Sequence, residues 1–276
     1  MRQNGNTEIN RILEVNKIES ISVSKETKVG NLLLAGATGY LGIHILADYL
    51  DNDNGIAYCL VRGKNKVDSK NRLSDLLRFY FDDKYSDMNR IKVIKADLQK
   101  DDLGLAQIEY DELLHSVDTI INAAASVKHY GTYKYFYEIN VEATKRLIDF
   151  CKRGNKKLIH ISTLSVSGNG FDNGLIKEEK YFSESDLYIG QPLENVYARS
   201  KFEAEKTAFE AILEGVQAKV LRMGNLTNRL SDGKFQQNYK SNAFLNRIRA
   251  LMKLKSYPES VADYEVEFTP IDKAAN

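Results

Sequence analysis

The chain has 276 residues, enough for one sizeable α/β domain and a small appendage. Its 39 Lys and Arg residues nearly balance 38 Asp and Glu residues, which argues against a nucleic-acid-binding or membrane-binding surface. Apolar residues make up 43%, and no apolar run reaches the roughly 18 residues that span a bilayer. We therefore expect a globular protein without a membrane segment.

The cysteine and histidine residues give no sign of a metal site. Cys59 and Cys151 each lie in an apolar stretch, so we expect buried thiols rather than a disulfide. The four histidines do not combine with them at metal-ligand spacing. The N-terminus also lacks the apolar core of a signal peptide. These features predict a reduced, cytoplasmic protein without a structural metal.

The first strand signal follows a polar segment. Residues 1–28 have no strand or nucleotide motif, and we expect a linker or N-terminal extension there with at most one short helix. From residue 29 to 228 apolar runs alternate with amphipathic stretches. The expected strands cover 28–37, 55–63, 90–98, 117–125, 156–166 and 217–227, and the expected helices cover 39–53, 69–81, 135–154 and 194–216. This alternation predicts an α/β fold, a doubly wound parallel (Rossmann) sheet covered by helices on both faces.

The pattern changes after residue 228. Residues 229–276 are mostly helical and basic in pattern, and we expect them to begin a small C-terminal substrate-binding lobe. A helix is predicted to start at Pro270 and to be cut after a turn or two, so the lobe is expected to be truncated. The predicted division is thus 1–28, 29–228 and 229–276.

A glycine triplet joins the first strand to the first helix in "LLLAGATGYLG". In this context the three glycines allow a tight turn, a close approach to a pyrophosphate, and close helix–strand packing. The helix N-terminus would add free amides for the anion. The alternative is a turn that merely needs glycine. The cofactor-binding residues expected here are Gly36, Thr38, Gly39, Tyr40, Leu41 and Gly42.

The end of the second strand favours a phosphorylated cofactor. A site that prefers NAD usually carries an acid there to bind the ribose 2′-hydroxyl. This chain has Arg62 and then Lys64 in "LVRGK", and Arg72 follows on the next helix. A guanidinium suits a 2′-phosphate, so we expect NADPH rather than NADH. Alternatively Arg62 only ends a surface strand, and Lys64 and Arg72 are ordinary solvated side chains.

Two further strand ends are candidate cofactor contacts. Asp97 and Leu98 end the third strand and are expected near the adenine. Asn122, Ala123 and Ala124 end the fourth, where small residues would let the cofactor ribose lie close to the backbone. Either group could instead belong to an ordinary loop. His129 and Tyr130 follow, with a substrate or a packing role.

In the last expected helix, Tyr197 and Lys201 are four residues apart, and positions i and i+4 share one helix face. A free tyrosine has a pKa near ~10 and is a poor acid at neutral pH, and a neighbouring ammonium is expected to lower that pKa. The alternative is that both side chains merely lie at the rim of an amphipathic helix.

The sequence resembles the extended short-chain dehydrogenase/reductase superfamily in four motifs that occur in this order: the glycine triplet, "NAAA", "ISTLSV" and "YARSK". The resemblance implies a catalytic set of Thr163, Tyr197 and Lys201, with Lys201 also reaching the nicotinamide ribose. Thr163 would donate to a substrate oxygen. Ser162 is an alternative, but adjacent strand residues should point to opposite faces. Asn140 matches a polar family position and is expected only to shape its helix.

Three longer stretches narrow the resemblance. They resemble the thioester reductase-like branch, which comprises the terminal reductase domains of nonribosomal peptide synthetases. The stretches are "SVKHYGTY", "RMGNLTNRLSDGKFQ" and "VEFTPIDKAA". Carboxylic acid, aminoadipate and fatty acyl-CoA reductases are related to it. Members of this branch carry a longer C-terminal lobe than residues 229–276 of this chain.

The resemblance implies reductive release of an acyl or peptidyl thioester from the phosphopantetheine arm of a carrier-protein domain, with NADPH as reductant. The product would be an aldehyde, or an alcohol after a second hydride, and the chain would be part of a larger multimodular protein. The basic stretch 240–255 would meet an acidic carrier, or is a solvated helix face.

Two other functions remain open from the sequence. One is a nucleotide-sugar epimerase or dehydratase of the same superfamily, although such enzymes prefer NAD and carry an acid where Arg62 stands. The other is a non-catalytic NADP-binding module.

Overall fold

The structure is a computed structural model that describes residues 28–128, 131–168, 182–184, 186–257, 259 and 267–276. The extension expected at 1–28 therefore lies outside the described residues except for Lys28, and so do His129 and Tyr130.

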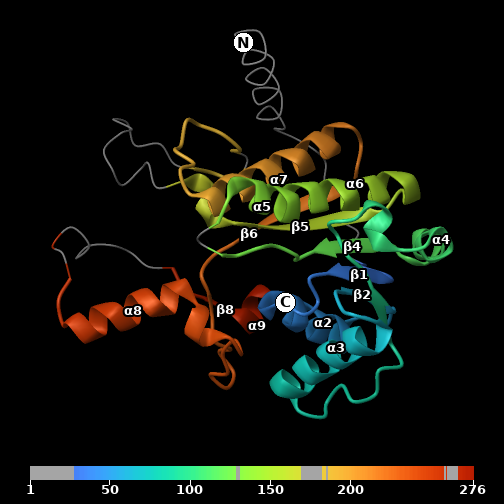
Figure 1. Ribbon diagram of the computed structural model, residues 1–276, viewed down its shortest axis with the longest axis horizontal. Coiled ribbons are helices and arrows are strands. Elements are labelled where there is room, and N and C mark those ends of the chain that lie inside the picture. Colours follow the sequence, from blue (N-terminus) through green and yellow to red (C-terminus); the bar gives the residue numbers. More distant parts are fainter. Residues whose placement is uncertain (1–27, 129–130, 169–181, 185, 258, 260–266) are drawn as a thin grey trace, which may run out of the picture.

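The core of the molecule is a six-stranded sheet in which every neighbouring pair is parallel (Figure 1). Its order is β3-β2-β1-β4-β5-β6, so the chain reverses direction across the sheet between β1 and β4. The strands are β1 Leu32–Ala35, β2 Ala57–Val61, β3 Ile91–Lys95, β4 Thr119–Asn122, β5 Lys157–Thr163 and β6 Ala218–Met223. The predicted doubly wound α/β fold is confirmed.

Burial along the strands follows their place in the sheet. Every residue of β1, β2 and β4 is buried, which explains their unbroken apolar runs. The edge strands β3 and β6 contain exposed residues such as Lys92 and Lys219. In β1, Leu32 and Leu34 face one apolar cluster, and Leu33 faces the other.

Helices cover both faces of the sheet (Figure 1). On one face α2 (Tyr40–Asn52) and α3 (Lys66–Phe81) pack over β1 and β2. On the other face lie α4 (Gln107–Ser116), α6 (Ala143–Gly154) and α7 (Val196–Leu213). The sequence analysis did not predict α4, because only Tyr110 and Leu113 of its ten residues are buried and its apolar stripe is correspondingly weak.

The long helix expected at 135–154 is one rod with an irregular middle. It comprises α5 (Tyr133–Phe136), a π-helical turn (η2, Tyr137–Glu142) and α6. The residue that ends it in the left-handed conformation is Asn155, with φ of 50°, rather than Gly154. A short 3₁₀ turn, η1 (Asp101–Gly104), precedes α4.

The C-terminal residues include one helix apart from the sheet and one short helix packed beside α2. The helix α8 (Ala243–Leu254) stands apart from the sheet (Figure 1), after the short turn η4 (Tyr239–Ser241). The two-residue strands β7 (Leu226–Thr227) and β8 (Thr269–Pro270) then pair in parallel. The helix α9 (Ile271–Ala274) follows Pro270 as predicted, and Ile271 is fully buried in the same cluster as α2.

Candidate active site

The glycine turn brings β1, β4 and α2 into close backbone contact. Gly36 has φ of +86°, and a Cβ added to it would lie 2.6 Å from the main-chain carbon of Ala123. A Cβ on Gly42 would lie 2.1 Å from the carbonyl oxygen of Gly36, whereas one on Gly39 would lie 3.1 Å from that oxygen. Gly36 and Gly42 are therefore required for packing, and Gly39 keeps the outer side of the turn small.

The N-terminus of α2 is suited to a phosphate. Its N-cap is Gly39, which provides no capping side chain, so the first amides of the helix remain available to an anion. Thr38 is half-buried beside them. The turn thus fits the pyrophosphate of a dinucleotide: it supplies amides, a positive helix end and space.

Two residues of the turn can contribute only main-chain atoms. The hydroxyl of Tyr40 donates to the carbonyl of Thr227 at 2.8 Å, and its ring packs against Phe235 with the ring centres 5.6 Å apart. The side chain of Leu41 is buried in the core. Their side chains therefore secure the turn, and their amides are what an anion could reach.

The end of β2 presents positive charge to solvent. Arg62 is exposed, and its carbonyl accepts a hydrogen bond from the guanidinium of Arg72, so these two residues are neighbours. Lys64 is also exposed, and its amide donates at 2.8 Å to Asp68, a carboxylate at the start of α3. A hydrogen bond with Ser126 lowers the pKa of the Tyr135 phenol, and Lys128 and then Arg62 add to this shift.

The residues after β3 and β4 differ in what they offer. The amide of Asn122 is buried and fully engaged: it donates to Thr144 at 3.1 Å and accepts from the Ala124 amide at 3.2 Å. Its side chain therefore fixes the end of β4, and Ala123 and Ala124 form the surface beside Gly36.

At the end of β3, Asp97 and Leu98 are both half-buried. The carboxylate of Asp97 accepts a hydrogen bond from the amide of Gln99 at 3.1 Å. The carbonyl of Leu98 accepts one from Arg146 at 3.3 Å. Both residues lie at the edge of the sheet to which the glycine turn belongs, because the carboxyl ends of parallel strands share one edge.

The three residues expected to take part in the reaction are all bonded to, or belong to, the last three residues of β5. Tyr197 lies in the first turn of α7, where Asn195 caps the helix by accepting from the amides of Tyr197 and Ala198 at 2.8 and 3.3 Å. The phenol of Tyr197 is hydrogen-bonded with Thr163, the last residue of β5. One helical turn further on, Nζ of Lys201 donates to the carbonyl of Ile161 at 2.6 Å.

The expected lowering of the Tyr197 pKa is wrong for this structure. Burial raises the pKa of the phenol, and only the hydrogen bond with Thr163 opposes that shift. The pKa of Lys201 falls to about 8 because the ammonium is buried, with Glu205 acting in the opposite direction. Tyr197 is protonated at neutral pH with or without this shift, and the raised pKa makes its phenol a weaker acid than a free tyrosine.

The structure also shows which of the two candidate hydroxyls, Thr163 or Ser162, faces Tyr197. The hydroxyl of Ser162 donates to the buried carboxylate of Glu205 at 2.6 Å, away from Tyr197. The oxygen of Thr163 accepts from the Ser165 amide at 3.2 Å and caps the 3₁₀ turn η3 (Leu164–Ser167). The hydroxyl of Ser165 lies 3.3 Å from that of Thr163 and is a second polar group here that the sequence analysis did not single out.

Asn140 has a supporting position in the π-helical turn. Its amide accepts from the amide of Ser126 at 2.7 Å and donates to Ser200 on α7 at 2.9 Å. It therefore connects the end of β4 to the helix that carries Tyr197 and Lys201, which agrees with the shaping role expected of it.

Two charged residues of the site were missed. Glu205 is fully buried and pairs with Arg222 on β6. Its spacing in "YARSKFEAE" was a usable signal, because positions 197, 201 and 205 repeat every four residues on one helix face. Arg222 gave no such signal, since its partner is distant in sequence.

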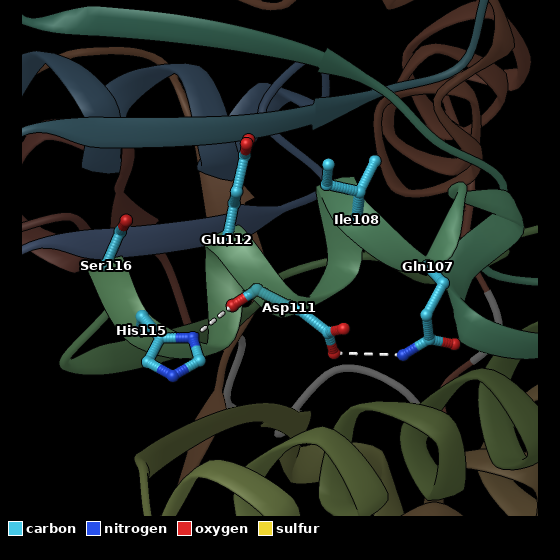
Figure 2. A pocket seen from close by; sticks show the side chains of 6 residues that line it. All are labelled: Gln107, Ile108, Asp111, Glu112, His115 and Ser116. Atoms are coloured by element: carbon cyan, nitrogen blue, oxygen red, sulfur yellow. Dashed lines mark hydrogen bonds between the residues drawn. The ribbon is translucent and has the colours of Figure 1, made fainter.

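A hollow elsewhere on the surface is not part of this site. It is open to solvent and is lined by six residues of α4 alone, as Figure 2 shows: Gln107, Ile108, Asp111, Glu112, His115 and Ser116. The hydrogen bonds drawn in Figure 2 stay within the helix and join Gln107 to Asp111 and His115 to the Asp111 carbonyl. Among the described residues, no group of three His, Cys, Asp or Glu side chains could hold a metal ion, and no helix is long and apolar enough to cross a membrane.

Known proteins of similar sequence are large reductases and synthetases. The chain is 28% identical over 259 residues to glycine betaine reductase ATRR of Emericella nidulans, covering 89% of this chain and 19% of that protein. It is 29% identical over 203 residues to the carboxylic acid reductase of Mycobacterium tuberculosis, covering 67% and 17% respectively. The chain thus spans about a fifth of the length of these relatives.

Solved structures give the same picture. A thiolation-reductase di-domain from an archaeal nonribosomal peptide synthetase has a TM-score of 0.82 and 37% identity, covering 97% of this chain and 56% of that one. The reductase domain of the aureusimine biosynthetic cluster has a TM-score of 0.79 and 29% identity, covering 100% and 71%. A UDP-glucuronic acid 4-epimerase from Bacillus cereus, at 20% identity, shares the fold alone.

A family model for NAD binding, described as "Male sterility protein", matches residues 34–276 and supports a nicotinamide cofactor. The resemblance to the thioester reductase-like branch of the short-chain dehydrogenase/reductases is confirmed by these matches. Because the match covers most of the chain, the protein belongs to the male sterility protein family.

Proposed function

We propose that this chain is an NADPH-dependent reductase domain that releases an acyl or peptidyl thioester from a carrier-protein domain as an aldehyde. The observation that carries the proposal is the hydrogen bond between Tyr197 and Thr163 at the carboxyl end of β5, with Lys201 bound to the carbonyl of Ile161 in the same strand, on the edge of the sheet that also holds the glycine turn. A phenol, a hydroxyl and an ammonium at that edge are the groups a carbonyl reduction needs.

The exposed cations at the end of β2 support NADPH over NADH. Arg62 and its neighbour Arg72 present guanidinium groups that can form charge-assisted bonds to a 2′-phosphate. Lys64 is a further exposed cation beside them. The carboxylate of Asp68 already accepts from the Lys64 amide and is placed to fix this loop.

The chemistry assigned to the protein is proton donation and charge stabilisation. Bound NADPH supplies the hydride for the thioester carbon. Tyr197, which is protonated at neutral pH as any ordinary tyrosine is, donates a proton to the carbonyl oxygen, and Thr163 hydrogen-bonds that oxygen as its charge develops. The C–S bond of the resulting hemithioacetal then breaks, which leaves an aldehyde and the free thiol.

Lys201 is assigned an electrostatic role. Its ammonium is buried, held by the carbonyl of Ile161, and lies one helical turn from Tyr197. An ammonium that moved toward the phenol during the reaction would favour the phenolate left after proton donation, whereas in this structure burial and the hydrogen bond with Thr163 set the pKa of Tyr197. The lysine would also bind the ribose hydroxyls of the cofactor.

The substrate class rests on the relatives. The di-domain structure joins a reductase to a thiolation domain, and other similar proteins are nonribosomal peptide synthetases, such as the non-canonical synthetase cpsA of Aspergillus campestris. A carrier-bound thioester in a larger multimodular chain is therefore the substrate we propose.

The test is an assay of the purified chain with NADPH and an acyl-pantetheine thioester. We expect loss of NADPH absorbance together with formation of aldehyde and free thiol in equal amounts. The free carboxylic acid of the same acyl group is the matched control and should give no turnover. Turnover of a nucleotide sugar instead, or NADPH binding without any turnover of the thioester, would contradict the proposal.

A further inference from the structure

A buried ion pair lies behind the proposed reactive groups and has no part in the chemistry above. Glu205 on α7 has no exposed side-chain surface, and the side chain of Arg222 on β6 is 10% exposed. Nε of Arg222 donates to Oε1 of Glu205 at 2.9 Å, and Nη2 donates to the same oxygen. Oε2 accepts from Ser162 at 2.6 Å. The carboxylate thus joins α7, β5 and β6.

The same guanidinium holds a stretch of chain that precedes α7. Arg222 donates from Nη1 to the carbonyl of Ser183 at 3.0 Å and from Nη2 to the carbonyl of Asp186. Its guanidinium carbon also lies 4.7 Å from the ring centre of Phe182. One side chain therefore fixes three residues of this stretch to the sheet.

That stretch packs against the turn that follows Thr163. Leu187 is buried against Val166 of η3 and Phe202 of α7. Gln191 donates at 3.0 Å to the carbonyl of Val166 and at 2.9 Å to that of Leu187. Since Thr163 caps η3, the position of the stretch and the position of Thr163 are mechanically linked.

Glu205 is also the charged group that faces Lys201. It lies one helical turn beyond Lys201 and opposes the loss of its proton, while burial favours that loss. From β5, His160 faces the same lysine and is held neutral by burial, with a pKa well below its usual value. Tyr197 precedes Lys201 by one turn, and Asn140, which reaches the neighbouring Ser200 from η2, carries no charge.

We propose that Glu205 and Arg222 are positioning residues of this active site. The ion pair fixes the stretch that bears Ser183 and Asp186 against η3, and through Glu205 it keeps the ammonium of Lys201 charged. This inference rests on the proposed thioester reduction, but its structural half can be measured without turnover.

Single replacements leave one charge buried without its partner, which by itself can unfold the chain. The main variant is therefore the double replacement Glu205→Met with Arg222→Met, in which two apolar side chains of similar length take the place of both charges. Glu205→Gln is the second variant, because its amide can still accept from Ser162. Glu214→Gln removes an exposed ion pair with Lys152 beyond the end of the same helix and is the matched control.

Each variant is tested in three ways: melting temperature and NADPH affinity, amide hydrogen exchange over residues 186–193, and the pH profile of thioester reduction. In the folded double variant we expect NADPH affinity to be retained, exchange over 186–193 to be faster, and kcat/KM to fall roughly 10- to 100-fold. In Glu205→Gln the loss of activity on the alkaline side should move to lower pH, because Lys201 gives up its proton more readily. The Glu214→Gln control should match the parent chain.

A folded double variant with unchanged exchange, or with normal kcat/KM and pH profile, would overturn the inference. If the parent chain does not reduce thioesters at all, the proposed function fails. The exchange measurement then still decides whether the ion pair fixes the stretch.

Discussion

The two ends of this candidate site are built in different ways. The cofactor end is made from backbone: the turn from Gly36 to Gly42 packs on the main chain of Ala123, and the first amides of α2 face outward. The reactive end is made from side chains on β5 and α7, and Thr163 and Tyr197 are 34 positions apart in the sequence. At the cofactor end a substitution fails because no space is left for an added Cβ atom. At the reactive end a substitution fails because a particular hydroxyl or ammonium group is lost.

Replacing Tyr197 by phenylalanine tests the reactive end most severely. The variant loses the proton donor and keeps the ring, so we expect kcat to fall by roughly 10²- to 10⁴-fold with little change in NADPH affinity. Steady-state kinetics and a fluorescence titration of the cofactor would measure the two effects. Tyr257→Phe, at an exposed tyrosine, is the control. Equal activity in the two variants would remove Tyr197 from the chemistry.

Replacing Gly42 by alanine tests the backbone end. The new Cβ would meet the Gly36 carbonyl at 2.1 Å, so we expect a loss of about 1–3 kcal/mol in the free energy of unfolding together with weaker NADPH binding. Gly39→Ala is the comparison, because its Cβ meets the same carbonyl only at 3.1 Å and should leave stability nearly unchanged while it hinders the cofactor. If urea unfolding shows the same stability for both, close packing at Gly42 is not what fixes the turn.

Replacing Arg62 by alanine asks which dinucleotide the backbone end prefers. Loss of a charge-assisted bond to the 2′-phosphate should weaken NADPH binding roughly 10-fold and leave NADH binding as it was. Calorimetric titrations with both cofactors would measure this, with Lys70→Ala as a control for the loss of an exposed cation on the following helix. A proportionate loss for NADH would mean that Arg62 does not bind the phosphate.

The last prediction concerns Lys201 and the pH dependence of stability. Its pKa is about 8 in the folded chain and near 10.5 when unfolded, so between these values the unfolded chain binds more protons. This difference makes the free energy of unfolding rise with pH over that window, by up to about 1.4 kcal/mol per pH unit. Lys201→Met should lack this contribution, and Lys206→Met on the same helix should keep it. Urea unfolding at pH 7.5, 8.5 and 9.5 would measure how the free energy of unfolding changes with pH. If that change is the same in the parent and Lys201→Met chains, Lys201 is not buried as a cation.

The features that the sequence analysis missed depend on contacts that are distant in the chain. The helix α4 buries only Tyr110 and Leu113, so its pattern is weak, although the parallel strands on either side require a crossover. The raised pKa of Tyr197 comes from burial, which the i, i+4 spacing with Lys201 does not report. Ile271 joins the core beside α2 through a return of the chain across more than 200 residues.

What the sequence by itself determined was local. A short apolar run indicated each strand, three glycines indicated the turn, and a phenol and an amine one turn apart marked one helix face, because these depend on neighbours a few residues away. Only the tertiary structure decided that Ser162 faces Glu205 while Thr163 meets Tyr197, and that Arg222 ties three segments together. Those choices depend on how β5, β6 and α7 pack, and packing brings together atoms whose separation along the chain leaves no periodic trace.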